Sequence, residues 1–233
     1  MNNAFLNKHY NEQIQALNHF IADTYAFLPH KDRSLIRFGG GTALAIYYFQ
    51  HRLSFDIDLF ATDMQVLSYL SPKHWIDETN HFNSSSYIDL SHHIRVLEKK
   101  NNIKIDVLVS HASSSNYLVD DSKTLFNETI YVESVEDIIA KKIVYRRHDN
   151  LTRDIIDIAI SIKYKEIFLE NLLVSGLINH KDVQELYDSF SQLDQQTFHE
   201  ELEIVAPFEK YLDDAKNAPE IIKWACQHIL LKQ

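Results

Sequence analysis

Cysteine, proline and glycine are all scarce in this chain. Its 233 residues include one cysteine, four prolines and four glycines. The single cysteine, Cys226, excludes both a disulfide within the chain and a cysteine-rich metal site. It lies in an apolar helical pattern, which favours a small buried side chain. The few prolines, and the lack of a Ser/Gly/Pro-rich spacer, argue against a long linker.

Long hydrophobic runs are also missing. No stretch of about 18 apolar residues occurs, and the first residues, MNNAFLNKHYNEQ, lack the basic end and apolar core of a signal peptide. We therefore expect a cytoplasmic protein with no membrane segment. Apolar residues make up 45% of the chain, enough for a folded protein with a substantial core.

Positive charge is in deficit. Lys and Arg total 23 against 33 for Asp and Glu, so the formal net charge is -10. A polyanionic substrate would need a local basic segment or metal ions to offset repulsion. One such segment contains Lys141, Lys142, Arg146, Arg147, Arg153, Lys163 and Lys165. It predicts either binding of a nucleotide and part of an RNA backbone, or an ordinary solvated helix face.

Hydrophobic periodicity predicts strands and helices in the first part of the chain. Helical spacing occurs at 10–28, 42–52 and part of 64–82, and strand patterns occur at 34–38, 54–61, 87–98 and 102–110. Thr42 is the predicted N-cap of its helix. Serine-rich stretches at 83–86 and 113–115 predict loops. This order of elements implies a mixed sheet with helices packed on it.

From Ser134 onward only helical periodicity remains. We therefore expect an α+β chain. Residues 1–130 would form a mixed sheet with flanking helices, and residues 131–233 an all-α region.

Two aspartates one residue apart carry the first chemical signal. Asp56 and Asp58 share one face of the predicted strand, because strand side chains alternate. Carboxylates held this close repel each other unless a divalent cation lies between them. Asp106, in the strand pattern at 102–110, offers a third carboxylate. Three oxygen ligands suit Mg²⁺ or Mn²⁺ rather than zinc.

Three of the four glycines are adjacent, at 39–41, just before a predicted helix. Backbone N–H groups in such a turn can approach a phosphate closely. A phosphate cradle and metal-binding carboxylates together indicate phosphoryl or nucleotidyl transfer. Each feature alone is weak, because GGG is more often a turn and acidic strand ends are common.

Two basic residues fall on the apolar stripe of the predicted helix 134–147. Lys142 and Arg146 share this stripe with Ile138, Ile139 and Ile143. They either extend along the edge of the core with solvated ends, or face a cleft where Lys142 holds nucleotide phosphates.

The order of these motifs resembles a known family. Gly40-Gly41-Thr42 followed by Asp56-x-Asp58 is similar to the signature of the DNA polymerase β-like nucleotidyltransferases. More narrowly, GGTALAIYYFQHRLSFDIDLF resembles the AbiEii/AbiGii toxin family, in which GGTAL, HR-x-S and D-x-D segments occur in this order. The resemblance extends over residues 34–160.

The same resemblance covers part of the helical region. The family pattern A-x-K, a basic residue, then R/K-D-x-x-D matches Ala140, Lys142, Arg146 or Arg147, and Arg153-Asp154-Ile155-Ile156-Asp157. It implies that Asp154 is functionally required. The position of both aspartates near the helix start also allows a simpler role, in which they, and Asp157 above all, stabilise that start through the helix dipole. Arg52 would orient the site or a phosphate, or form a structural ion pair with a nearby acid. Ser54 would position the strand end.

The resemblance implies Mg²⁺-dependent transfer of a nucleoside monophosphate from an NTP to an acceptor hydroxyl. Asp56, Asp58 and Asp106 would bind the metal, and Asp106 would also accept the hydroxyl proton. Gly40, Gly41 and Thr42 would hold the triphosphate, with Arg52, Ser54 and Arg146 as further nucleotide contacts, and Lys142 would neutralise it.

The acceptor implied by the resemblance is the tRNA 3′ end, and the setting is a toxin–antitoxin or phage-defence system with a cognate antitoxin protein. One alternative is a nucleotidyltransferase with a small-molecule acceptor. Another is a non-catalytic nucleotide-binding or toxin-neutralising protein. The presence of all three acids favours an enzyme.

Overall fold

The computed structural model describes residues 3–110 and 116–232, and the predicted loop at 113–115 lies outside them. The chain divides into two compact units. The first contains the residues up to Tyr47 together with Ser54–Ser134, and the second contains Tyr48–Leu53 together with the chain from Val135 onward. The short segment Tyr48–Leu53 therefore belongs to the helical unit, although both of its flanks belong to the sheet unit.

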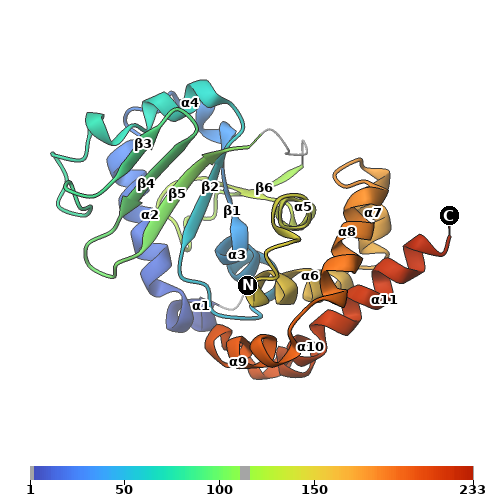
Figure 1. The fold of residues 1–233 in the computed structure, drawn as a ribbon. Helices are drawn as coiled ribbons and strands as arrows, with labels where there is room; N and C mark the ends of the chain where they lie inside the picture. Colours follow the sequence, from blue (N-terminus) through green and yellow to red (C-terminus); the bar gives the residue numbers. More distant parts are fainter. Residues whose placement is uncertain (1–2, 111–115, 233) are drawn as a thin grey trace. The chain divides into compact units, whose positions relative to one another are not determined.

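A mixed β-sheet forms the centre of the first unit (Figure 1). Within the described residues its strands lie in the order β3 (Ile88–Leu90), β4 (His93–Leu97), β5 (Lys104–Val109), β2 (Ile57–Ala61), β1 (Ile36–Gly39), β7 (Ile130–Glu133) and β6 (Tyr117–Asp120). β2 is parallel to β5, β1 is parallel to β7, and the other neighbours are antiparallel. This sheet confirms the predicted fold class.

The helical elements that begin in the first unit are α1 (Asn3–His9), α2 (Asn11–Thr24), α3 (Gly40–Ala43), α4 (Met64–Tyr69) and the short turns η1 (His30–Leu35), η2 (Leu44–Phe49) and η3 (Pro72–His74). α2 runs along the sheet (Figure 1) and buries Ile14, Leu17 and Ile21, as its periodicity predicts. α3 continues directly into the π-helical turn η2, and η2 leads the chain into the second unit.

The alternation along β2 and β5 separates an apolar face of the sheet from a polar one. Ile57 and Ile105 pair in register and are both fully buried. The next pair, Asp58 and Asp106, must point to the opposite face, because side chains alternate along a strand. The polar face of the sheet therefore carries the predicted acidic residues.

Helices make up the second unit. They are α5 (Val135–Arg146), α6 (Thr152–Tyr164), α7 (Phe168–Val174), α8 (His180–Ser191), α9 (Gln195–Val205), η4 (Glu209–Tyr211), α10 (Leu212–Lys216) and α11 (Ala218–Leu230). The core of this unit includes Ile156 and Ile160 of α6 packed with Leu202 of α9. Cys226 is buried, as predicted, and burial raises the pKa of its thiol to about 12.

Several element predictions need correction. The run at 87–98 is a hairpin of β3 and β4, and β6 and β7 are additional strands. Asp56 lies just before β2 instead of within it. Thr42 is not an N-cap, because α3 begins at Gly40 and Gly39 occupies the cap position.

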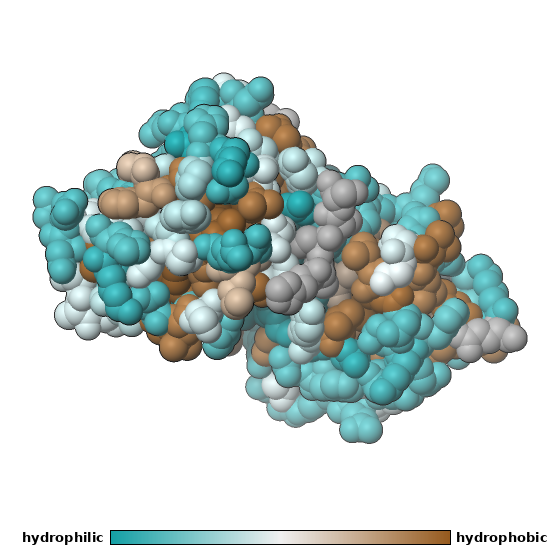
Figure 2. Space-filling view, turned by 90° about the horizontal axis from the view of Figure 1, so that it is seen from above, coloured by the Kyte–Doolittle hydropathy of each residue, from teal (hydrophilic) through white to brown (hydrophobic). Residues whose placement is uncertain are grey.

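Polar side chains dominate the face shown in Figure 2, with separate apolar patches among them. Exposed apolar residues include Phe55, Val174, Ile204 and Trp224. Single exposed apolar side chains are usual in folded proteins. Across residues 3–110 and 116–232, the structure contains no helix with the length and apolar content needed to cross a membrane.

Candidate active site

The glycine turn packs directly on a carboxylate of the D-x-D pair. Gly40 has a φ of +66°, and a Cβ atom on it would lie 2.1 Å from Asp58 Oδ2. The preceding residue, Gly39, is paired in register with Asp58 between β1 and β2. Any other residue at position 40 would be strained and would displace the carboxylate. The glycine motif therefore has a structural reason to accompany Asp58.

A further acid lies beside Gly39. A Cβ atom on Gly39 would lie 2.0 Å from Glu133 Oε2 and 2.7 Å from the Phe60 ring. Glu133, the last residue of β7, is completely buried. Glu133 is not among the predicted site residues, although an acidic residue that ends an apolar strand pattern is a signal for a polar sheet face.

Thr42 fixes the chain segment that carries Asp56. Thr42 is fully buried, and its hydroxyl donates to the carbonyl oxygen of Asp56. Its oxygen also lies 2.8 Å from Ser54 Oγ, and the Ser54 carbonyl accepts a hydrogen bond from Gln13 in α2. Thr42 and Ser54 therefore position Asp56, and the buried Thr42 hydroxyl is already engaged within the protein. This geometry disfavours the predicted contact of Thr42 with a triphosphate.

Asp106 contacts two basic side chains from the neighbouring strand. Its Oδ1 lies 2.6 Å from His93 Nε2 and accepts a hydrogen bond of 2.7 Å from Arg95 Nε. Arg95 is paired in register with Asp106 between β4 and β5. The hydrogen bond from Arg95 to Asp106, together with the negative charges of Asp106, Asp56 and Asp58, raises the pKa of Arg95 above its usual value. Asp56, Asp58 and Asp106 therefore all stabilise the charged form of the Arg95 guanidinium.

Lys104 connects two of these acids. Its Nζ lies 2.9 Å from Asp56 Oδ2 and 3.8 Å from Asp106 Oδ2. His93, Arg95 and Lys104 are not among the predicted site residues. The period-2 pattern contained the signal, because alternate residues of two paired strands share a face.

The predicted metal-binding acids are not arranged as a preformed metal site in the described residues. Within residues 3–110 and 116–232, no group of three His, Cys, Asp or Glu side chains is arranged to bind a metal ion. Asp56 and Asp106 instead form ion pairs with Lys104 and Arg95. The donors nevertheless fit Mg²⁺ or Mn²⁺ in kind, because carboxylate oxygens are the ligands that these ions prefer.

A second cluster of predicted residues lies in the helical unit. Lys142 of α5 is buried, and its ammonium contacts a carboxylate oxygen of Asp154 and lies 3.1 Å from Asp157 Oδ2. Asp154 also pairs with Arg146 at 3.1 Å. The predicted residues Lys142, Asp154 and Arg146 are therefore brought together.

Asp157 is the centre of this cluster. It is fully buried and lies in the second turn of α6, so it does not serve mainly to stabilise the helix start. Its carboxylate accepts hydrogen bonds from Arg52 Nε and Nη2, both at 2.7 Å, and lies 2.6 Å from His51 Nε2. Burial alone would raise the pKa of Asp157. The charges of Arg52 and Lys142 and the hydrogen bond from His51 outweigh burial and hold this pKa well below its usual value.

Arg52 is consequently engaged within the protein. Besides Asp157, its guanidinium donates to the Leu53 carbonyl at 2.8 Å, and the side chain is 4% exposed. Of the two predicted roles, the geometry favours the structural ion pair over a phosphate contact. Because Asp157 lies 105 residues after Arg52, no local sequence pattern could reveal this pair.

Much of the basic segment 141–165 is neutralised by acids of the same unit. Arg147 pairs with Glu185, and Lys163 pairs with Asp214. Lys165 lies 2.7 Å from Glu136. The arrangement favours a paired helix surface over a surface that tracks an RNA backbone.

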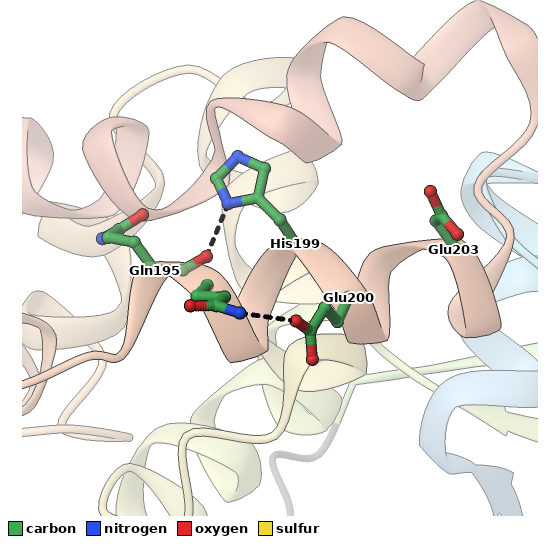
Figure 3. A pocket seen from close by; sticks show the side chains of 5 residues that line it. Gln195, His199, Glu200 and Glu203 are labelled. Carbon is green, nitrogen blue, oxygen red and sulfur yellow. Dashed lines mark hydrogen bonds between the residues drawn. The ribbon is translucent and has the colours of Figure 1, made fainter.

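A surface hollow in the helical unit contains no predicted site residue. Its lining residues are Gln195, Gln196, His199, Glu200 and Glu203. Figure 3 shows that these side chains come from one helix, α9. Within it, His199 Nδ1 contacts the Gln195 carbonyl oxygen, and Gln196 Nε2 donates a hydrogen bond to Glu200 Oε1. Since neighbouring elements supply no lining residue, this hollow has no convergent groups for chemistry.

A match to a protein-family model agrees with the motifs. The family model described as "Nucleotidyl transferase AbiEii toxin, Type IV TA system" matches residues 25–224. The crystal structure of JHP933 from Helicobacter pylori is similar in fold, with 17% identity, a TM-score of 0.50, and coverage of 97% of this chain and 91% of that one. MenT4, a nucleotidyltransferase toxin from Mycobacterium tuberculosis, is 15% identical with a TM-score of 0.47, over 96% of this chain and 99% of that one. No curated protein sequence matches.

Proposed function

Because the chain belongs to the AbiEii nucleotidyltransferase toxin family, we propose that it transfers a nucleoside monophosphate from an NTP to an acceptor hydroxyl with the help of a divalent metal ion. The hydroxyl oxygen forms a bond to the α-phosphorus, and the bond between that phosphorus and the bridging oxygen of the β-phosphate breaks. Pyrophosphate leaves, and the hydroxyl proton passes to a base, the role predicted for Asp106.

The close approach of Gly40 to Asp58 carries this proposal. A Cβ atom at Gly40 would lie 2.1 Å from the carboxylate, so the backbone of the glycine turn and the D-x-D acid occupy one small volume. A phosphate near the glycine N–H groups would then also be near Asp58. This juxtaposition suits a nucleotide phosphate accompanied by a metal ion.

Asp56, Asp58 and Asp106 would hold the metal ion. When bound, the ion supplies charge neutralisation and a fixed orientation for the phosphates. Thr42 and Ser54 keep Asp56 in place through their contacts with its chain segment. His93 and Arg95 hold Oδ1 of Asp106, which leaves Oδ2 as the oxygen nearer to Lys104, at 3.8 Å from its Nζ.

Lys142 would neutralise the triphosphate, as the family resemblance implies. Its ammonium already binds two carboxylates, so phosphate binding would exchange at least one of these contacts. Asp154 and Arg146 would tune that exchange, because both lie in the same ion cluster. Arg52 would act through Asp157 and not on the nucleotide.

The proposed acceptor is the 3′ end of tRNA, and the proposed partner is an antitoxin protein. The family description names a type IV toxin–antitoxin system, which supports the second point. NTPs and tRNA are cytoplasmic molecules, so the proposed reaction takes place in the cytoplasm.

A labelling experiment tests the proposal. The purified protein is incubated with each α-³²P-labelled NTP, Mg²⁺ and total tRNA, beside the Asp56→Ala/Asp58→Ala variant. We expect label on RNA only with the unaltered protein, and loss of label when EDTA is added. Label on a small molecule instead of RNA would show that this molecule, and not tRNA, is the acceptor. No transfer to any acceptor, with NTP binding retained, would favour a non-catalytic nucleotide-binding protein.

A further inference from the structure

Lys104 lies where two of the proposed metal ligands converge. Its Nζ is 2.9 Å from Asp56 Oδ2 and 3.8 Å from Asp106 Oδ2, so one ammonium faces one oxygen of each carboxylate. The two acids come from separate chain segments, one before β2 and one within β5. A common cation contact therefore defines a point that both oxygens face.

The surroundings of Asp106 leave Oδ2 as the oxygen that is available to a further cation. Arg95 Nε and His93 Nε2 both contact Oδ1, at 2.7 Å and 2.6 Å. The contact of Arg95 Nη2 with Oδ2 is long, at 3.4 Å. A further cation at Asp106 would therefore bind Oδ2, the oxygen that already faces Lys104.

The ammonium and a divalent ion make different demands on these oxygens. An ammonium hydrogen bonds to oxygens at 2.7–2.9 Å, whereas Mg²⁺ requires oxygens at about 2.0–2.1 Å. Both need the same pair of carboxylates, and two cations at one such point repel each other. The Lys104 side chain is 34% exposed, so its ammonium has solvent to move into.

We propose that Lys104 competes with the divalent ion for Asp56 and Asp106, so that metal binding must displace its ammonium. This inference rests on the proposed metal-dependent function. Lys104 thereby sets the metal concentration at which the site fills. It also keeps the acids compensated whenever the ion leaves, which lowers the repulsion between Asp56, Asp58 and Asp106.

Binding of Mn²⁺ without any nucleotide tests the competition directly. Free Mn²⁺ is measured by electron paramagnetic resonance during titration of the full-length protein at constant ionic strength. Lys104→Gln removes the ammonium and keeps a side chain of similar length. Lys99→Gln is the matched control, because Lys99 is an exposed lysine in the turn before β5 and its replacement removes the same charge from the protein.

We expect Lys104→Gln to bind Mn²⁺ about two- to fivefold more tightly than the unaltered protein, the size expected for one partly exposed ion pair. Lys99→Gln should change the affinity less than about twofold, through screened long-range charge. An affinity of Lys104→Gln equal to or weaker than that of the unaltered protein would overturn the competition.

The Asp56→Asn/Asp58→Asn variant separates this inference from the proposed function. If that variant binds Mn²⁺ as well as the unaltered protein, the proposed metal site itself is wrong. If it loses Mn²⁺ binding while Lys104→Gln shows no gain, the site stands and only the competition fails. Urea unfolding of each variant verifies that the folded state is being compared.

Discussion

Arg52 and Asp157 form a buried bidentate ion pair in the helical unit, with Arg52 Nε and Nη2 each 2.7 Å from one carboxylate oxygen. This pair joins the HR segment to the R-D-x-x-D segment, two motifs that lie far apart in the sequence. Lys142 lies 3.1 Å from the same carboxylate. Asp157 therefore orients the lysine that we propose to act on the triphosphate.

Replacing Asp157 should destabilise the protein strongly. Asp157→Asn leaves Arg52 and Lys142 buried without a full countercharge, and removing one partner of such a pair costs about 3–5 kcal/mol. Asp149→Asn changes an exposed acid just before α6 and should stay within about 0.5 kcal/mol. Urea unfolding measures both variants. Equal free energies of unfolding for the two would contradict the structural role of Asp157.

The pH dependence of stability should report His51. Burial lowers the pKa of His51, against the effect of the Asp157 hydrogen bond and with smaller contributions from Arg52 and Lys142. Its neutral form is therefore favoured in the folded state. The unfolded chain takes up a proton near pH 6.5, so this stabilisation is complete above that pH and is lost as the pH falls toward the folded-state pKa.

We accordingly expect the unaltered protein to lose more stability than His51→Gln between about pH 7 and pH 5, with a difference in slope of up to about 1.4 kcal/mol per pH unit. His148→Gln, at a side chain that is 66% exposed, serves as the control. Urea unfolding at several pH values provides the curves. Parallel curves for the unaltered protein and His51→Gln would show that His51 is not held neutral.

Gly40→Ala should abolish nucleotidyl transfer. The new methyl group would meet the Asp58 carboxylate, and a positive φ costs a non-glycine residue roughly 1–2 kcal/mol in addition. Gly176→Ala is a close control, because Gly176 has a φ of +73° but no atom within 4 Å of the added Cβ. Both variants should lose stability, and only Gly40→Ala should lose activity at a temperature where it remains folded. Full activity in Gly40→Ala would remove the main support for the proposed site.

Thr42→Val should impair activity through the position of Asp56. Valine has the shape of threonine but leaves the Asp56 carbonyl without the hydroxyl donor, a loss of about 1–3 kcal/mol for a buried group. Thr42→Ser keeps the hydroxyl and should retain most of the transfer rate. Thr24→Val alters another fully buried threonine of this unit, whose hydroxyl donates to Phe20 within α2. Rates measured with saturating NTP should fall for Thr42→Val and not for Thr24→Val.

The sequence predicted elements with one buried face better than elements without one. α2, β2 and β5 were anticipated because burial of a single face imposes helical or alternating periodicity on the apolar residues. β6 escaped prediction because most of it is exposed, so its residues show little alternation. The sequence predicts one strand pattern where the structure has the hairpin of β3 and β4, since no glycine or proline marks the turn at Ser91–His92.

Site prediction depended on whether strand alternation alone indicates which side chains share a face. The placement of Asp58 beside Asp106 was expected because both strands alternate, and the register of β2 and β5 agrees with it. The contact between Gly40 and Asp58 gives the glycine motif a reason beyond phosphate binding, one that depends on strand pairing. The partners of Thr42 and Arg52 could not be named from the sequence, because only the folded chain brings the Asp56 carbonyl and the Asp157 carboxylate beside them.

The assignment of Tyr48–Leu53 to the helical unit has a consequence for synthesis on the ribosome. His51 leaves the ribosome 106 residues ahead of Asp157, its hydrogen-bonding partner. All residues of the sheet unit can be translated before the helices that bury this segment have been synthesised. A gene split after residue 134 would place His51 and Arg52 on the fragment without the helices. The separately made helices would then hold a buried Asp157 that keeps Lys142 but lacks its contacts with His51 and Arg52.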